Sequence, residues 1–101
     1  MNKRIVNSCI EISQLLLTVG KEHDAYNNIV ILSENLENEI RRLLIYNPSE
    51  GTLVDINSVV FSIQKLTNAL NHDDVSILYD VLRFELPNRI ENLRMDYDYD
   101  K

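Results

Sequence analysis

Two histidines stand directly before aspartates, and these short pairs are the residues of the chain best suited to metal chemistry. His23 precedes Asp24, and His72 precedes Asp73 and Asp74. Imidazole and carboxylate groups at close spacing are common zinc ligands. Asp is equally a preferred residue at helix N-termini, where its carboxylate accepts hydrogen bonds from backbone amides. Because both pairs precede segments with helical periodicity, we expect Asp73 to cap a helix and predict no bound metal.

The remaining reactive side chains form no catalytic pattern. Cys9 is the single cysteine and falls on an apolar face of its predicted helix, where a thiol behaves as a small hydrophobic group. No serine has a base beside it, the two glycines are far apart, and neither HExxH nor Glu-x-x-His occurs. We therefore expect that the protein is not an enzyme and needs no cofactor.

Glu85 is a carboxylate predicted to lie between two apolar stripes of its helix, where an unpaired charge would be costly. Arg89 follows it at the i,i+4 spacing of helical ion pairs. We interpret this pair as a structural salt bridge.

Charge and composition limit the classes of partner. The chain has 101 residues, 16 acidic and 10 basic, and a net charge of −6. Nucleic acids and anionic lipids are bound mainly through Lys and Arg, and no basic run occurs. No apolar stretch is long enough for a signal peptide or a membrane span. We expect a cytoplasmic protein whose partner is another protein or a second copy of itself.

Apolar residues recur at spacings of three and four in four segments, which predicts an all-α fold. We expect helices over about 2–19, 24–46, 52–70 and from 73 onward, with breaks near 20–23, 47–52 and 71–73. Gly20 is suited to the left-handed position after the first helix, Asp24 and Thr52 to the starts of the second and third. Pro87 should kink the fourth helix or restart it.

Short links between these helices favour a four-helix up-down bundle. A three-helix core with a kinked fourth helix is the alternative. Residues 1–95 form the predicted single domain, and residues 96–101, the sequence DYDYDK, form a predicted flexible acidic tail.

The first and fourth helices carry more apolar surface than one core-facing stripe requires. The first helix has a main stripe and a second stripe beside it: Ile5, Cys9, Ile12, Leu16 and Val19, then Val6, Ile10 and Leu17. The fourth helix repeats this arrangement: Val75, Leu78, Leu82 and Leu86, then Ile77, Val81 and Phe84. On each helix the two stripes span about 220° of the helical wheel.

Two interpretations of these wide arcs are open. Both helices could be central and deeply buried, or the second stripes could together form one exposed surface for association. The second interpretation predicts an interface made of six residues: Val6, Ile10, Leu17, Ile77, Val81 and Phe84.

The segment 73–93 resembles a recurrent C-terminal pattern of small uncharacterised helical proteins of Gram-positive bacteria. In that pattern an acidic residue opens a helix, an Asp follows, and a Glu-Leu pair precedes a proline and another acidic residue. The matching positions are Asp73, Asp80, Glu85, Leu86, Pro87 and Glu91. The aromatic residue that ends the pattern is absent here. Those proteins have no established activity, so the resemblance implies a helical bacterial protein and no function.

The leading functional hypothesis is a small helical protein-interaction module, an adaptor, chaperone-like protein or regulator, that acts through the surface of its first and fourth helices. A structural homodimer is the first alternative, because a two-fold pairing needs only one apolar patch. An immunity or antitoxin-like inhibitor of a basic target is the second, since the chain is small, acidic and helical.

Overall fold

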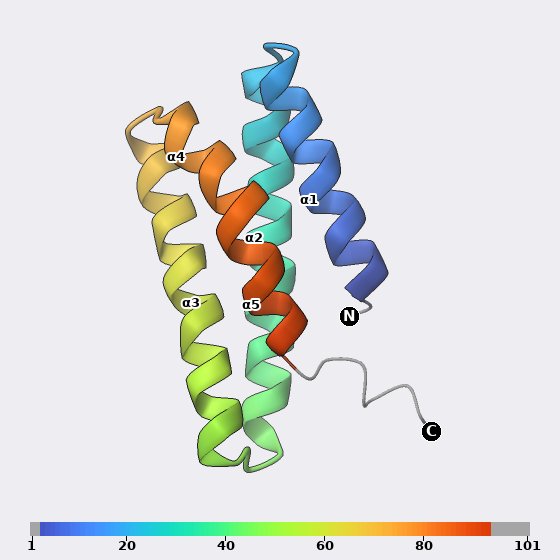
Figure 1. Cartoon of the computed structure of the whole chain (residues 1–101), viewed down its shortest axis with the longest axis vertical. Helices are drawn as coiled ribbons and strands as arrows, with labels where there is room; N and C mark the ends of the chain where they lie inside the picture. Colours follow the sequence, from blue (N-terminus) through green and yellow to red (C-terminus); the bar gives the residue numbers. More distant parts are fainter. Residues whose placement is uncertain (1–2, 94–101) are drawn as a thin grey trace.

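Helices make up nearly all of the part of the chain that the computed structural model describes, residues 3–93 (Figure 1). The elements in order are α1 Lys3–Thr18, α2 Glu22–Ile45, α3 Glu50–Asn71, α4 Val75–Asp80, η1 Val81–Glu85 and α5 Leu86–Asn92. The last three follow one another without a break, and we call them the C-terminal arm. No strand occurs within the described residues, so the predicted all-α fold is confirmed. The predicted tail, residues 96–101, lies outside them.

The helices form an up-down bundle, as predicted. α1, α2, α3 and the C-terminal arm each run antiparallel to the one before, and the arm lies between α1 and α3 (Figure 1). The contacts form a closed ring, from α1 to α2, α2 to α3, α3 to the arm and the arm back to α1. No helix of the described part is both long and apolar enough to cross a membrane.

The turn after α1 follows the prediction made from Gly20. Gly20 has a φ of 82°, and the amides of Gly20 and Lys21 bond back to carbonyls of the last turn of α1. This is the arrangement in which a left-handed residue satisfies the free carbonyls at a helix end. The predicted start of α2 at Asp24 is wrong, because α2 begins at Glu22 with Lys21 at its cap and no side-chain capping bond.

Two aspartates have different structural roles at the turn between α3 and α4. Asp73 has a φ of 53°, and its amide and that of Asp74 bond to the carbonyls of Leu70 and Ala69 at 3.4 and 2.9 Å. The Asp74 carboxylate accepts a bond from the Ile77 amide at 3.2 Å. Asp74 is therefore the cap of α4, and the prediction that Asp73 caps it is wrong. Asp73 instead takes the left-handed position that ends α3, which Asp tolerates better than most residues.

These separate roles predict effects of different size on stability. Asp74→Ala should lower the free energy of unfolding by about 1 kcal/mol, as is typical for a lost cap. Asp73→Gly should lower it less, since glycine adopts positive φ without steric cost and this gain offsets the loss of the hydrogen bond between the Asp73 carboxylate and Tyr26. Urea unfolding of both variants measures the two effects. A larger loss in Asp73→Gly than in Asp74→Ala would contradict the assignment.

The N-cap of α3 lies about one turn earlier in the sequence than predicted. The Ser49 hydroxyl accepts a bond from the Thr52 amide at 3.2 Å, so α3 begins at Glu50. Thr52, the predicted cap, lies within the first turn.

Pro87 changes the helix one turn before its own position. The segment Val81–Glu85 is π-helical, and a new α-helix then begins with proline in its first turn. In a π-helix the donor to the Leu82 carbonyl would be residue 87, and proline has no N–H to give. The Gln14 amide of α1 donates to that carbonyl instead, at 2.9 Å. The predicted restart of the helix is confirmed, and α1 supplies the hydrogen bond that the proline lacks.

The Gln14 bond gives a second stability prediction. Gln14→Leu should lower the free energy of unfolding by about 1 kcal/mol, although it adds an apolar side chain, because a buried carbonyl loses its donor. Gln64→Leu is the matched control, since Gln64 is exposed on α3. The two unfolding free energies are compared in urea, and equal values would remove the role given to Gln14.

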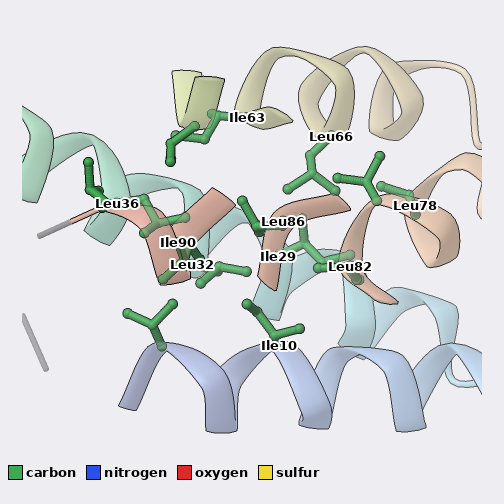
Figure 2. Close-up of a cluster of buried hydrophobic side chains, with 14 of the residues drawn as sticks. Ile10, Ile29, Leu32, Leu36, Ile63, Leu66, Leu78, Leu82, Leu86 and Ile90 are labelled. Atoms are coloured by element: carbon green, nitrogen blue, oxygen red, sulfur yellow. The ribbon is translucent and has the colours of Figure 1, made fainter. Parts of the chain in front are cut away.

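The core is aliphatic and draws on every helix. Figure 2 shows Ile10 pointing from α1 into the cluster that contains Ile29 of α2 and Leu82 of the arm. These three side chains are almost wholly buried. The only two phenylalanines of the chain, Phe61 and Phe84, lie on the surface instead.

Candidate interaction surface

The six predicted interface residues do not form one exposed surface. Four of them belong to the core, with 0–7% of their area exposed: Val6, Ile10, Leu17 and Val81. Ile77 and Phe84 do lie on the surface, 41% and 60% exposed. The prediction that all six form a common surface on the folded chain is therefore wrong for the first four.

The two apolar faces of α1 are the reverse of those expected. The stripe taken for the core contains Ile5, Ile12 and Val19, and each of these is more than half exposed. Its other members, Cys9 and Leu16, are partly buried beside the core. α1 does have a wide apolar arc, but the stripe predicted to face the core faces outward, and the stripe predicted to face outward faces the core.

A buried serine explains this reversal. Ser13 lies with Val6, Ile10 and Leu17 on the inner face of α1 and is fully buried. Its hydroxyl donates to the Cys9 carbonyl at 2.9 Å and accepts from the side-chain amide of Asn28 on α2 at 3.2 Å. Both hydrogen bonds satisfy the hydroxyl, so burying it costs little. In the sequence, the same serine interrupts the true core stripe and makes it look secondary.

The outer face of α1 has the spacing of a helix-packing seam. Its residues, with one from the turn that follows, recur at intervals of three, four, three and four, and we call them the outward stripe: Ile5, Ser8, Ile12, Leu15 and Val19 of the turn. All five are exposed, and the four apolar ones are 51–61% exposed. This heptad spacing is that of helices that pack side by side with knobs in holes.

α2 packs along one side of α1, and polar contacts with the C-terminal arm lie on the other. Ile31 is half exposed and follows Asn28, which contacts α1, by one helical turn. On the opposite side of α1, Lys3 and Gln14 bond to carbonyls of the C-terminal arm. This polar edge lies between the outward stripe and the arm, where Ile77 and Phe84 lie.

Glu85 is held by three groups where the arm packs on α3. Its carboxylate bonds to Lys65 at 2.7 Å, to the Ser62 hydroxyl at 2.8 Å and to Arg89 at 3.1 Å. Partial burial by itself would raise the pKa of Glu85, but the bonds from Lys65 and Ser62 and the charge of Arg89 outweigh it. The pKa of Glu85 therefore lies below its ordinary value. The predicted ion pair with Arg89 is confirmed.

The groups around Glu85 are used in joining α3 to the arm. Arg89 also donates to the carbonyl of Ser58 at 3.0 Å and to the Ser62 hydroxyl at 2.9 Å. The charged ends of Lys65 and Arg89 each lie 5.6 Å from the centre of the Phe61 ring. The carboxylate is fully engaged by donors, so this cluster is built as a connection between helices.

The residues first considered for chemistry are not brought together. His72 contacts the carbonyl of Asn68 on its own helix at 2.8 Å. Within residues 3–93, no group of three or more His, Cys, Asp or Glu side chains has the arrangement of a metal site. Burial raises the pKa of the Cys9 thiol, which disfavours the reactive thiolate.

Comparison of the chain with protein families, curated proteins and solved structures finds no match. The resemblance of residues 73–93 to small helical bacterial proteins stays a prediction.

Proposed function

We propose that this protein is a cytoplasmic protein-interaction module that binds an α-helix of its partner along the outward stripe of α1. It acts as an adaptor or regulator by helix-to-helix contact and carries no catalytic centre. The interface predicted from the sequence is thereby moved from the inner face of α1 to its outer face.

The observation that supports this function is the placement of two apolar faces on one 16-residue helix. The inner face already completes the core with Val6 and Ile10. The outer face does not contribute to it, and leaving apolar area in water forgoes about 25 cal/mol for each Å². Heptad spacing suits a helical partner, because a second helix presents knobs at the same intervals.

The experiment is a capture comparison with three forms of the purified protein. Wild type and Leu15→Glu differ at the middle of the outward stripe, and Val54→Glu places the same charge on an exposed apolar position of α3. We expect a protein from an extract of the source organism to bind wild type and Val54→Glu and to lose at least tenfold in affinity for Leu15→Glu. The identified partner is then measured as a purified protein. Equal binding to all three forms would contradict the proposal.

A further inference from the structure

We infer that the helix that occupies the outward stripe is α1 of a second copy, packed antiparallel about a two-fold axis. This inference rests on the proposed function and names the partner of the same surface. A two-fold pairing brings one patch against itself, so it needs nothing beyond the outward stripe.

The charge distribution favours a second copy at this face. Residues 1–18 contain Lys3, Arg4 and Glu11, which sum to +1. The whole chain has a charge of −6, so the other 83 residues carry −7. Two copies therefore repel each other least when they meet through α1.

Side-chain size favours the antiparallel orientation. If the two-fold axis passes level with residue 10, Ile12 of one copy lies opposite Ser8 of the other, and Ile5 lies opposite Leu15. A large side chain then meets a small one at the centre, which is the arrangement that fills space between facing helices. In a parallel pair the two Ser8 side chains would face each other and leave a gap.

The helix dipoles favour the same orientation. The first turn of α1 has no acidic residue and carries Lys3 and Arg4, so its own dipole is unfavourable to them. The last turn has no basic residue. In an antiparallel pair, the positive N-terminal end of each α1 dipole lies near the negative C-terminal end of the other, so the two dipoles attract each other.

The contact area sets the expected strength. A helix of 16 residues is about 24 Å long. A contact of this length belongs to the small class of interfaces, which are weak and transient. We therefore expect a weak monomer–dimer equilibrium, with a dissociation constant on the order of tens to hundreds of micromolar.

The first test is sedimentation across this concentration range. Wild type and Val54→Glu should shift from monomer to dimer as concentration rises. Leu15→Glu should stay monomeric with an unchanged melting temperature. A wild type that stays monomeric up to the millimolar range overturns the inference.

The second test is disulfide cross-linking and reports orientation. Cys9→Ser removes the only native thiol, and Ser8→Cys or Ile12→Cys is then added to two differently tagged chains. The antiparallel pair predicts that a mixture of the two forms a mixed disulfide at least five times more than either chain forms with itself. Thr18→Cys, exposed on α1 outside the stripe, is the control and should cross-link little. Preferential linkage between identical chains overturns the antiparallel arrangement.

The two proposals fail in different ways. If the protein is monomeric but still binds another protein through Leu15, the second copy is ruled out as the partner and the proposed interaction module stands. A dimer unaffected by Leu15→Glu, together with unchanged capture, removes both.

Discussion

Ile10→Glu should prevent folding, whereas Ile12→Glu, two residues further along the same helix, should leave the fold intact. Ile10 is 2% exposed and Ile12 is 51% exposed. An ionised carboxylate at Ile10 would be buried among aliphatic side chains without a partner, which is among the costliest single changes. Total stability of a domain is only about 5–15 kcal/mol. At Ile12 the same carboxylate remains in water, and we expect a change within about 0.5 kcal/mol.

Circular dichroism and thermal melting measure both variants. Val81→Glu is a second test of the core, since the sequence placed Val81 on the outer surface and the structure buries it to 3% exposure. It should unfold like Ile10→Glu. If Ile10→Glu and Val81→Glu melt cooperatively near the wild-type temperature, the assignment of the inner faces is wrong.

Replacing Glu85 by Ala should lower the free energy of unfolding by about 2 kcal/mol, within the range of hydrogen bonds to charged groups. The change leaves Lys65 and Arg89 side by side without the carboxylate that separates their charges. Glu91→Ala is the matched control, because Glu91 is an exposed glutamate of the same C-terminal arm. Its effect should stay within about 0.5 kcal/mol. Urea unfolding distinguishes the two, and equal effects would contradict the role given to Glu85.

The same cluster predicts how stability depends on pH. The pKa of Glu85 is lower in the folded than in the unfolded chain, so its contribution is complete above the ordinary glutamate pKa of about 4.3. It is lost as pH falls through the folded pKa, because the unfolded chain then binds the proton more readily. As the pH is lowered from 7 to 3, the melting temperature should therefore fall less steeply for Glu85→Gln than for wild type.

Glu39 keeps part of this acid sensitivity in the Glu85→Gln variant. Burial would raise the pKa of Glu39, but its hydrogen bonds and ion pair with Arg42 lower it overall. The slope for Glu85→Gln should thus be reduced and not abolished. An unchanged slope would show that Glu85 does not titrate with folding.

The helices and their order could be predicted from the sequence because periodicity and turn residues are local signals. Gly20 and Pro87 acted as expected from their own backbone chemistry. Capping residues were misplaced by one to three positions, since several residues near each start can cap. Between Asp73 and Asp74, only the chain path decides which carboxylate reaches the first turn.

The face of α1 that enters the core could not be predicted from periodicity. Two stripes of similar apolarity lie side by side on this helix, and only contacts with α2 and the arm choose between them. The inner face can be buried because Ser13 accepts a hydrogen bond from Asn28, fifteen residues away in the sequence. A local pattern of residues does not indicate such a contact. In the arm, Val81 follows the buried Leu78 by three residues and is buried with it and with Leu82, so the core-facing arc is wider than the single stripe assigned from the sequence.

The most direct test of the outer face as the binding face is isoleucine-methyl NMR across a protein concentration series. We expect the signals of Ile5 and Ile12 to shift or broaden with concentration, while those of the buried Ile10 and of Ile45, exposed at the end of α2, stay in place. The Leu15→Glu variant should show no such change. Concentration-dependent shifts at Ile45 or Ile77, with Ile5 and Ile12 unmoved, would contradict it.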